Sequence, residues 1–504
     1  MNGPNRRRFL SGSGGALLGG PAWSALGGLL PGRRAEAAVA PELVRLRPEI
    51  EPVVRWIEET PRGAIFDRAV EELKGGLPYR ELLAALFLAG VRNIHPRPVG
   101  FKFHAVLVIN SAHQLSLDAA PRDRLLPFFW ALDNFKSSQE QDVRQGDWAL
   151  GPPPSEASLP RATEAARLFR EAMERWDEPA AEAAAIRLAR TAGAEAIAGE
   201  LWAYGARNYR NIGHNIIFTA QAFRTLDTIG WQHAEPVLRS LVYGILDGAR
   251  GEASAEPFEP NRELARGVRP DWLDGSSPAQ AAADLLGALR EGSPRETARA
   301  VADALNAGVP PQAVWDGLML RANELMLQRP GIVSLHAVTA LNSMHYAYRA
   351  AGPPETRLLL TLQGASWLAF FRGEMGQRGQ AAPADAMGID GLEPERAGGP
   401  PTLEAVYEVV GADPVRAARL TLAYAEGGGS AEAFMDLGRA LLFRKGTDVH
   451  DYKFSAAAFE EFALADPRWR PRLLATSVFR LKGAGDRDSP LARRAEEALD
   501  RLRA

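Results

Sequence analysis

The sequence contains no cysteine among its 504 residues. This absence excludes disulfides, iron–sulfur clusters, thiolate-bound metals and covalent c-type haem attachment, so any metal must be bound through nitrogen and oxygen. The formal net charge of −3 argues against a nucleic-acid-binding surface and against binding to an anionic membrane. Common catalytic motifs are also missing: the chain has no P-loop, no His-Glu-x-x-His and no Gly-x-Ser-x-Gly nucleophile elbow.

Signals for β-strands are nearly absent, because alternating apolar and polar runs bounded by tight-turn residues do not occur. Apolar residues recur instead at helical spacing, and hydrophobic residues make up 46% of the chain. We therefore expect an all-α fold. Beyond the N-terminal segment, no run approaches the roughly 18 consecutive apolar residues that favour a membrane helix, so we expect no stable membrane span.

The N-terminus has the features of a targeting segment. Arg6, Arg7 and Arg8 precede a glycine-rich apolar stretch, and small residues follow at Ala38-Val39-Ala40. This arrangement resembles a twin-arginine export signal, which we assign to residues 1–40. It predicts the twin-arginine export machinery as a partner and a periplasmic or extracellular location. The alternative is a basic N-terminal segment without regular structure.

The remaining chain contains an internal duplication. Phe103–His113 reads FHAVLVINSAH and Leu335–His345 reads LHAVTALNSMH. Further along, Gly213–Phe223 (GHNIIFTAQAF) matches Val449–Phe459 (VHDYKFSAAAF). We predict two tandemly duplicated helical halves, residues 41–250 and 279–504, joined by a linker at 251–278 and packed with pseudo-two-fold symmetry.

The duplication sorts the eight histidines of the chain. Six of them occupy equivalent positions in the two halves, as the pairs His104/His336, His113/His345 and His214/His450. His95 and His233 have no counterpart. Two halves that differ almost everywhere else therefore agree on three histidines each.

Helix geometry limits which of these histidines can share a centre. Residues nine apart lie about 180° apart around a straight helix, so His104 and His113 cannot both face one point. The same holds for His336 and His345. We prefer a centre formed by His104, His214, His336 and His450. Five residues are outer or alternative ligands: His113, His345, Asn110, Asn342 and Asp448.

Four imidazoles form a nitrogen site that suits iron, copper, nickel or zinc and disfavours magnesium or calcium. The alternative is structural, with paired histidines that hydrogen-bond across the interface between the halves. The halves also differ beside the last histidine, where Lys453 replaces Ile217 and Asp448 precedes His450. Lys453 lies one helical turn from His450, on the same face. A surface lysine paired with Asp448 or Glu460 is the alternative.

The motif at His336 (HAVTALNSMH) and the pattern Asp448-x-His450-x-x-Lys453 resemble those of the questin oxidase-like family. The resemblance implies a helical oxygenase that acts on anthraquinone-type polyketides with O2 at a non-haem iron. It implies four histidine ligands and a carboxylated lysine, here His104, His214, His336, His450 and Lys453. An aromatic substrate would then stack near aromatic residues of a kind that more often belong to the core: Phe101, Phe103, Phe218, Trp231, Trp367 and Phe454.

Two other functions remain open at this point. A dinuclear copper oxidase would use three histidines from each half, although the nine-residue spacing opposes it. A non-enzymatic helical-repeat binding protein would bind no metal and would tolerate replacement of its histidines.

Overall fold

The computed structural model describes residues 46–248, 257–276, 280–378, 386–396 and 398–503. The predicted export signal lies outside the described residues, as do parts of the predicted linker. The described residues form 22 α-helices and no strand, which confirms the all-α prediction.

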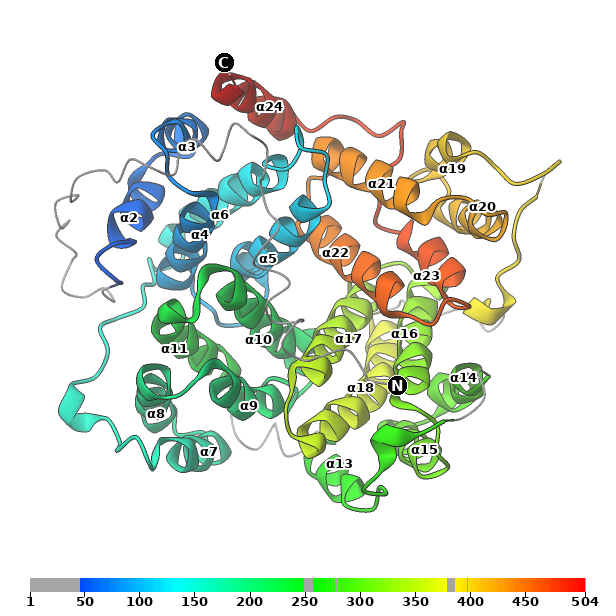
Figure 1. The fold of residues 1–504 in the computed structure, drawn as a ribbon, viewed down its shortest axis with the longest axis horizontal. Helices are drawn as coiled ribbons and strands as arrows, with labels where there is room; N and C mark the ends of the chain where they lie inside the picture. The colour runs from blue at the N-terminus through cyan, green and yellow to red at the C-terminus, as the bar shows by residue number, and fades with distance from the viewer. Residues whose placement is uncertain (1–45, 249–256, 277–279, 379–385, 397, 504) are drawn as a thin grey trace.

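Four helices surround the centre of the molecule in a closed ring (Figure 1). They are α5 (His104–Leu117), α10 (Arg210–Ile229), α17 (Ile332–Ala350) and α22 (Val449–Leu464). α10 and α22 each pack against both α5 and α17, so every helix of the ring has two neighbours within it. These helices are buried around most of their circumference, and the buried residues include polar as well as apolar side chains.

The remaining helices surround this ring. In the first half they are α2 (Glu51–Glu59), α3 (Ile65–Lys74), α4 (Tyr79–Asn93), α6 (Leu126–Arg144), α7 (Ala165–Arg175), α8 (Glu178–Thr191), α9 (Ala194–Gly205) and α11 (Ala234–Ile245). In the second they are α14 (Ala281–Glu291), α15 (Pro294–Asn306), α16 (Pro311–Gln328), α18 (Pro354–Gln377), α19 (Leu403–Val409), α20 (Pro414–Glu426), α21 (Ala431–Lys445), α23 (Arg470–Ser477) and α24 (Pro490–Arg503). Short 3-10 helices occur at Phe101–Phe103, Glu156–Ser158, Trp231–His233, Trp272–Asp274 and Ile389–Gly391.

The two predicted halves share one continuous core. The last helix, α24, crosses back to pack against α3 and α6 of the first half. Arg494 on α24 donates to Asp133 on α6 at 3.3 Å, and its guanidinium lies 4.0 Å from the ring centre of Phe66 on α3. The pseudo-two-fold relation itself stays a prediction.

Part of the segment predicted as a linker forms a packed helix, α13 (Phe258–Ala265). It lies against α15 and α18. The side-chain amide of Asn261 donates to Gln363 at 2.7 Å and to Ser366 at 2.9 Å, and all three side chains are buried. The described part of this segment therefore belongs to the core of the second half.

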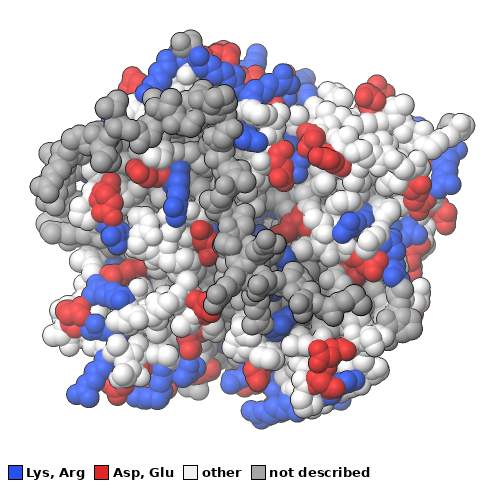
Figure 2. Space-filling view, viewed as in Figure 1, with Lys and Arg blue, Asp and Glu red and all other residues white. Residues whose placement is uncertain are grey.

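Acidic and basic side chains are interspersed over the face of the molecule shown in Figure 2, as expected for a net charge near zero. Within the described part of the chain, no helix is both long enough and apolar enough to cross a membrane.

Candidate metal centre

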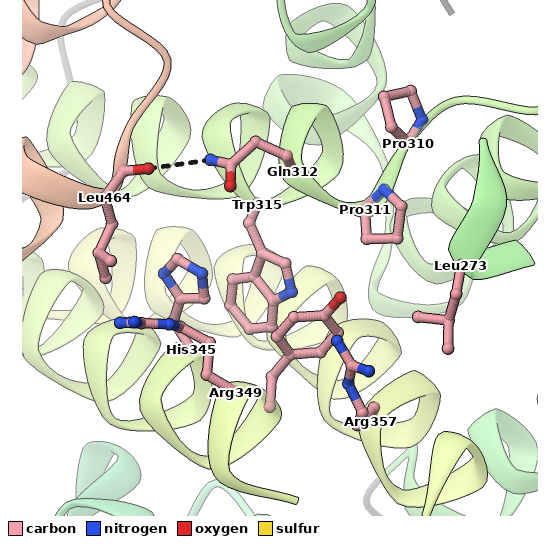
Figure 3. A pocket seen from close by; sticks show the side chains of 10 residues that line it. Leu273, Pro310, Pro311, Gln312, Trp315, His345, Arg349, Arg357 and Leu464 are labelled. Atoms are coloured by element: carbon pink, nitrogen blue, oxygen red, sulfur yellow. Dashed lines mark hydrogen bonds between the residues drawn. The ribbon is translucent and has the colours of Figure 1, made fainter. Parts of the chain in front are cut away.

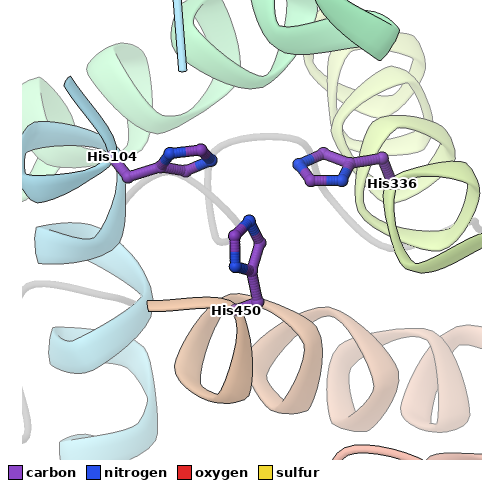
Figure 4. Close-up of side chains that lie close together, drawn as sticks. All are labelled: His104, His336 and His450. Carbon is purple, nitrogen blue, oxygen red and sulfur yellow. The ribbon is translucent and has the colours of Figure 1, made fainter. Parts of the chain in front are cut away.

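Four histidines, one from each helix of the central ring, come together at its middle. His104 opens α5, His336 lies in the first turns of α17, His450 is the second residue of α22, and His214 follows a kink in α10. Figure 4 shows His104, His336 and His450 pointing toward one another from three helices. We call His104, His214, His336 and His450 the four-imidazole centre.

The Nε2 atoms are the ones that converge. Nε2 of His214 lies 2.9 Å from Nε2 of His104 and 3.1 Å from Nε2 of His336. Candidate ligand atoms of His104, His336 and His450 all lie within 4.8 Å of one another. Nε2 of His450 is buried and has no hydrogen-bond partner among the described residues.

Each Nδ1 of the centre is held by an acceptor close to it in sequence. The acceptors are the carbonyl of Phe101 for His104 (2.8 Å), the carbonyl of Asn211 for His214, the carbonyl of Ile332 for His336 (2.6 Å), and the carboxylate of Asp448 for His450 (2.6 Å). Carbonyl and carboxylate oxygens only accept, so each Nδ1 must carry the proton. In the neutral imidazole, Nε2 is then an unprotonated acceptor.

Acceptors that face one another at these distances repel unless a cation lies between them. A proton on one Nε2 would relieve only one contact at a time. A metal ion would relieve all of them, because two nitrogens each about 2.1 Å from one metal at a right angle lie roughly 3 Å apart. The donor set and the spacing therefore fit a transition metal bound through nitrogen.

A proton is an unfavourable cation between these nitrogens, because the imidazoles are buried. Burial lowers the pKa of His104, His214 and His336 well below the usual range, and nearby Lys453 and neighbouring imidazoles add to the effect. Burial also lowers the pKa of His450, although the hydrogen bond to Asp448 opposes the shift. The centre is thus a set of neutral ligands at neutral pH.

The kink in α10 explains how His214 reaches the centre. Asn211, Ile212 and Gly213 all have left-handed backbone conformations, with φ of 54°, 50° and 82°. A left-handed backbone conformation is unusual for a β-branched residue such as Ile212. The kink turns the carbonyl of Asn211 toward the imidazole of His214, and a Cβ at Gly213 would lie only 2.8 Å from the Cβ of Ala340 on α17.

Glycine is also required on the other side of His214. Gly100 has φ of +119°, and a Cβ there would lie 3.2 Å from the imidazole of His214. The backbone of the loop before α5 therefore packs directly on this ring, in the segment that also supplies the carbonyl acceptor for His104.

Lys453 lies beside the centre, one turn along α22 from His450. Its side chain is 2% exposed, and Nζ has no hydrogen-bond partner among the described residues. The alternative of a surface lysine is therefore wrong. Burial lowers the pKa of Lys453 to about 7, and the lysine in turn lowers the pKa of all four histidines.

Asp448 is both a helix cap and the partner of His450. It forms a capping box with Asp451 at the start of α22. The hydrogen bond from His450 lowers the pKa of Asp448 to about 2, so the carboxylate is charged at neutral pH. The side chain of Asp448 is 54% exposed, which makes this edge of the centre the one nearest to solvent.

Comparison of the chain with protein-family models, with curated proteins and with solved structures finds no match. The resemblance to the questin oxidase-like family therefore stays a prediction.

The second histidine of each repeated pair lies elsewhere. His113 on α5 is buried against Tyr79, with Nδ1 3.1 Å from the phenol oxygen. His345 on α17 donates from Nδ1 to Glu461 at 2.8 Å and stacks on Trp315 with ring centres 4.6 Å apart. The nine-residue spacing therefore directs His113 and His345 away from the centre, as helix geometry required.

The two predicted asparagines do not play equivalent roles. Asn110 is buried, and neither polar atom of its amide has a partner among the described residues. The amide of Asn342 donates to Glu460 at 2.8 Å and to Glu461 at 2.9 Å, so it joins two acids of α22. Asn342 thereby supports Glu461, the partner of His345.

Most of the aromatic residues considered for substrate stacking are core. Phe103, Phe218, Trp367 and Phe454 are all fully buried, and Phe103 packs edge-on to Phe218 at 4.7 Å. Phe101 is 73% exposed, while its carbonyl oxygen accepts from His104.

The carbonyl acceptors could not be predicted from the sequence, because any residue can supply a backbone carbonyl. Glu461 is one of two acids in the largely apolar stretch Phe454–Leu464, and it lies on the same side of α22 as His450, about three turns further on, so it could have been found.

We predict a pH effect from His113. Burial lowers its pKa to about 4, whereas an imidazole in the unfolded chain titrates near 6.5. The unfolded chain binds more protons between these values, so stability falls as the pH falls through this range. When the pH is lowered from ~8 to ~5, the contribution of His113 should reduce the free energy of unfolding by about 2 kcal/mol.

Urea unfolding of the wild type and of His113→Gln at both pH values measures this contribution. The difference in unfolding free energy between the two pH values should be smaller in His113→Gln by that amount. Equal pH dependence of the two proteins would show that His113 is not buried in its neutral form.

Proposed function

We propose that the protein is an exported non-haem iron-dependent oxygenase or oxidase. Its metal would be held by His104, His214, His336 and His450 between the two halves. The observation that carries the proposal is the convergence of Nε2 atoms whose imidazoles each have Nδ1 tied to an acceptor. The same fixing of the second ring nitrogen is typical of histidines that bind metals.

The choice of metal follows from the donor set and from the family resemblance. A site made of imidazole nitrogens suits iron, copper, nickel or zinc. The resemblance to questin oxidase-like proteins favours iron, and copper is the alternative. When bound, Fe(II) would supply redox chemistry with O2. The same resemblance suggests an aromatic, polyketide- or quinone-like small molecule as the substrate.

Lys453 would complete the centre as a carboxylated lysine. Four neutral imidazoles leave the charge of a divalent cation uncompensated in a buried site, which is costly. The centre also lies at the N-terminal ends of α5, α17 and α22, whose dipoles favour an anion. A carbamate on the buried, unpartnered Nζ of Lys453 would supply that negative charge.

Asp448 would hold the imidazole of His450 in place. It fixes the Nδ1–H tautomer and raises the basicity of the ligand nitrogen, as carboxylates behind metal-bound histidines do. Being half-exposed, it lies on the side from which O2 and a substrate would arrive.

The N-terminal segment supports export by the twin-arginine route, which carries proteins that have already folded. The proposed ligands are far apart in the sequence, so the chain must fold before the metal centre can form. Export of a folded protein suits such a centre. The mature protein would then act in the periplasm or outside the cell.

The alternatives fit the geometry less well. A dinuclear copper oxidase needs His113 and His345, and these contact Tyr79 and Glu461 instead. A non-enzymatic helical-repeat protein would have to keep facing acceptors in its interior without a metal, which destabilises the fold.

Metal analysis tests the proposal. Protein purified from iron-supplied cells should contain about one iron per chain, and His336→Ala should reduce metal affinity roughly tenfold or more, because a ligand is lost. Elemental analysis by mass spectrometry after gel filtration measures the content. His233→Gln, which changes a histidine outside the centre, is the matched control and should bind as the wild type does.

Two coppers per chain would favour the dinuclear alternative. No metal in the wild type, or equal affinity in His336→Ala, would rule out the proposed centre.

A second prediction concerns Lys453. Protein exchanged into 13C-bicarbonate should show a carbamate resonance for about one lysine per chain, since a buried neutral amine can react with CO2. The resonance should be absent from Lys453→Met. Lys136→Met is the matched control, because Lys136 is also buried but its Nζ donates to the carbonyls of Ile57 and Glu58.

In Lys136→Met the carbamate resonance should persist. A signal that survives in Lys453→Met, or no signal in the wild type loaded with diamagnetic zinc, would exclude the carboxylated lysine.

A further inference from the structure

A second candidate site lies where His345 approaches the surface (Figure 3). The cavity has a volume of about 440 Å³, within the range of small-molecule pockets. It is lined by Leu273, Pro310, Pro311, Gln312, Trp315, His345, Tyr348, Arg349, Arg357 and Leu464. We call it the Trp315 pocket. It contains none of the residues of the four-imidazole centre.

Two nitrogen donors of this pocket lack acceptors. Nε1 of Trp315 and Nε of Arg357 are buried, and neither has a hydrogen-bond partner among the described residues. Trp315 is 1% exposed. Buried donors without partners are costly, so they favour a ligand that brings acceptor atoms.

The charge of the pocket favours an anion. Arg357 and Arg349 both line it. The guanidinium of Arg357 lies 4.4 Å from the ring centre of Tyr348, which orients it over an aromatic face. A planar guanidinium suits a carboxylate, which can accept two parallel hydrogen bonds.

The walls favour an aromatic body. The indole of Trp315 stacks on His345 with an angle of 10° between the rings, and the ring centre of Tyr348 lies 5.3 Å from that of Trp315. Leu273, Pro310 and Leu464 add apolar surface. Flat aromatic surfaces of this kind stack favourably with a ligand ring.

His345 adds one acceptor to the pocket. Its Nδ1–H donates to Glu461 at 2.8 Å, and Glu461 is held in turn by Asn342 at 2.9 Å. In the neutral imidazole, Nε2 is then an acceptor, and it can accept from a hydroxyl group of a ligand.

The two halves differ at this position. In the register that aligns the repeated histidines, the first half has Leu83 for Trp315, Ser116 for Tyr348, Leu117 for Arg349 and Thr225 for Glu461. The features that make a pocket around His345 therefore do not surround His113.

We propose that the Trp315 pocket binds a small aromatic carboxylate that carries a hydroxyl group. The carboxylate contacts Arg357 and Nε1 of Trp315, the ring lies against Tyr348 and the apolar wall, and the hydroxyl donates to Nε2 of His345. The site is independent of the metal proposed above.

Calorimetric titration of the full chain with 4-hydroxybenzoate tests the site, after treatment with a chelator so that the four-imidazole centre cannot contribute a metal. Binding should be saturable. Phenol, which lacks the carboxylate, and inorganic phosphate, which lacks the ring, should each bind at least tenfold more weakly. These comparisons use the wild type and do not depend on how a variant folds.

Arg357→Gln should weaken the binding of 4-hydroxybenzoate at least tenfold. Arg378→Gln, at the exposed end of the same helix and paired with Glu374, is the matched control and should not change it. No binding to the wild type, equal binding of phenol or phosphate, or unchanged binding by a folded Arg357→Gln would each overturn the proposal.

Discussion

The facing of unprotonated imidazole nitrogens in a buried interior is the interaction on which the central architecture depends. Three carbonyls and one carboxylate fix the protons on Nδ1, and burial opposes any further protonation. Nε2 of His214 is then brought to about 3 Å from Nε2 of His104 and of His336, and a ligand atom of His450 lies within 4.8 Å of those of His104 and His336. Only a cation makes this arrangement favourable, and a transition metal is the cation that the donors suit.

The arrangement of α5, α10, α17 and α22 in a ring is tied to the same convergence of histidines. Each helix brings its histidine to the centre from its N-terminal end, and in α10 this requires three consecutive left-handed residues. Strain of this kind persists where the surroundings stabilise it, often at functional sites. The close contacts of Gly100 with His214 and of Gly213 with α17 supply that support.

The residues around the repeated histidines differ between the two halves. Asp448 and Lys453 flank the centre only on α22, so a site built from paired elements has one charged side. On α17, His336 and His345 face opposite directions, one toward the centre and one toward the Trp315 pocket. A single helix thus contributes to two chemically distinct places.

Much of this could be predicted from the sequence, because hydrophobic periodicity and the duplication are strong local signals. The repeats predicted which histidines could meet. The kink at Asn211–Gly213 could not be predicted, since it depends on contacts with α17 that are distant in sequence. The helix α13 was hidden by the Gly- and Pro-rich composition around it. The pairing of His345 with Glu461 joins two helices and has no local signature.

X-ray absorption spectroscopy at the metal edge of the iron-loaded protein tests the central claim most directly. The account predicts scattering from four imidazole rings, with first-neighbour nitrogens at about 2.1 Å, and the loss of one ring in His214→Ala. A spectrum without imidazole scattering, or one that is unchanged in that variant, would contradict it.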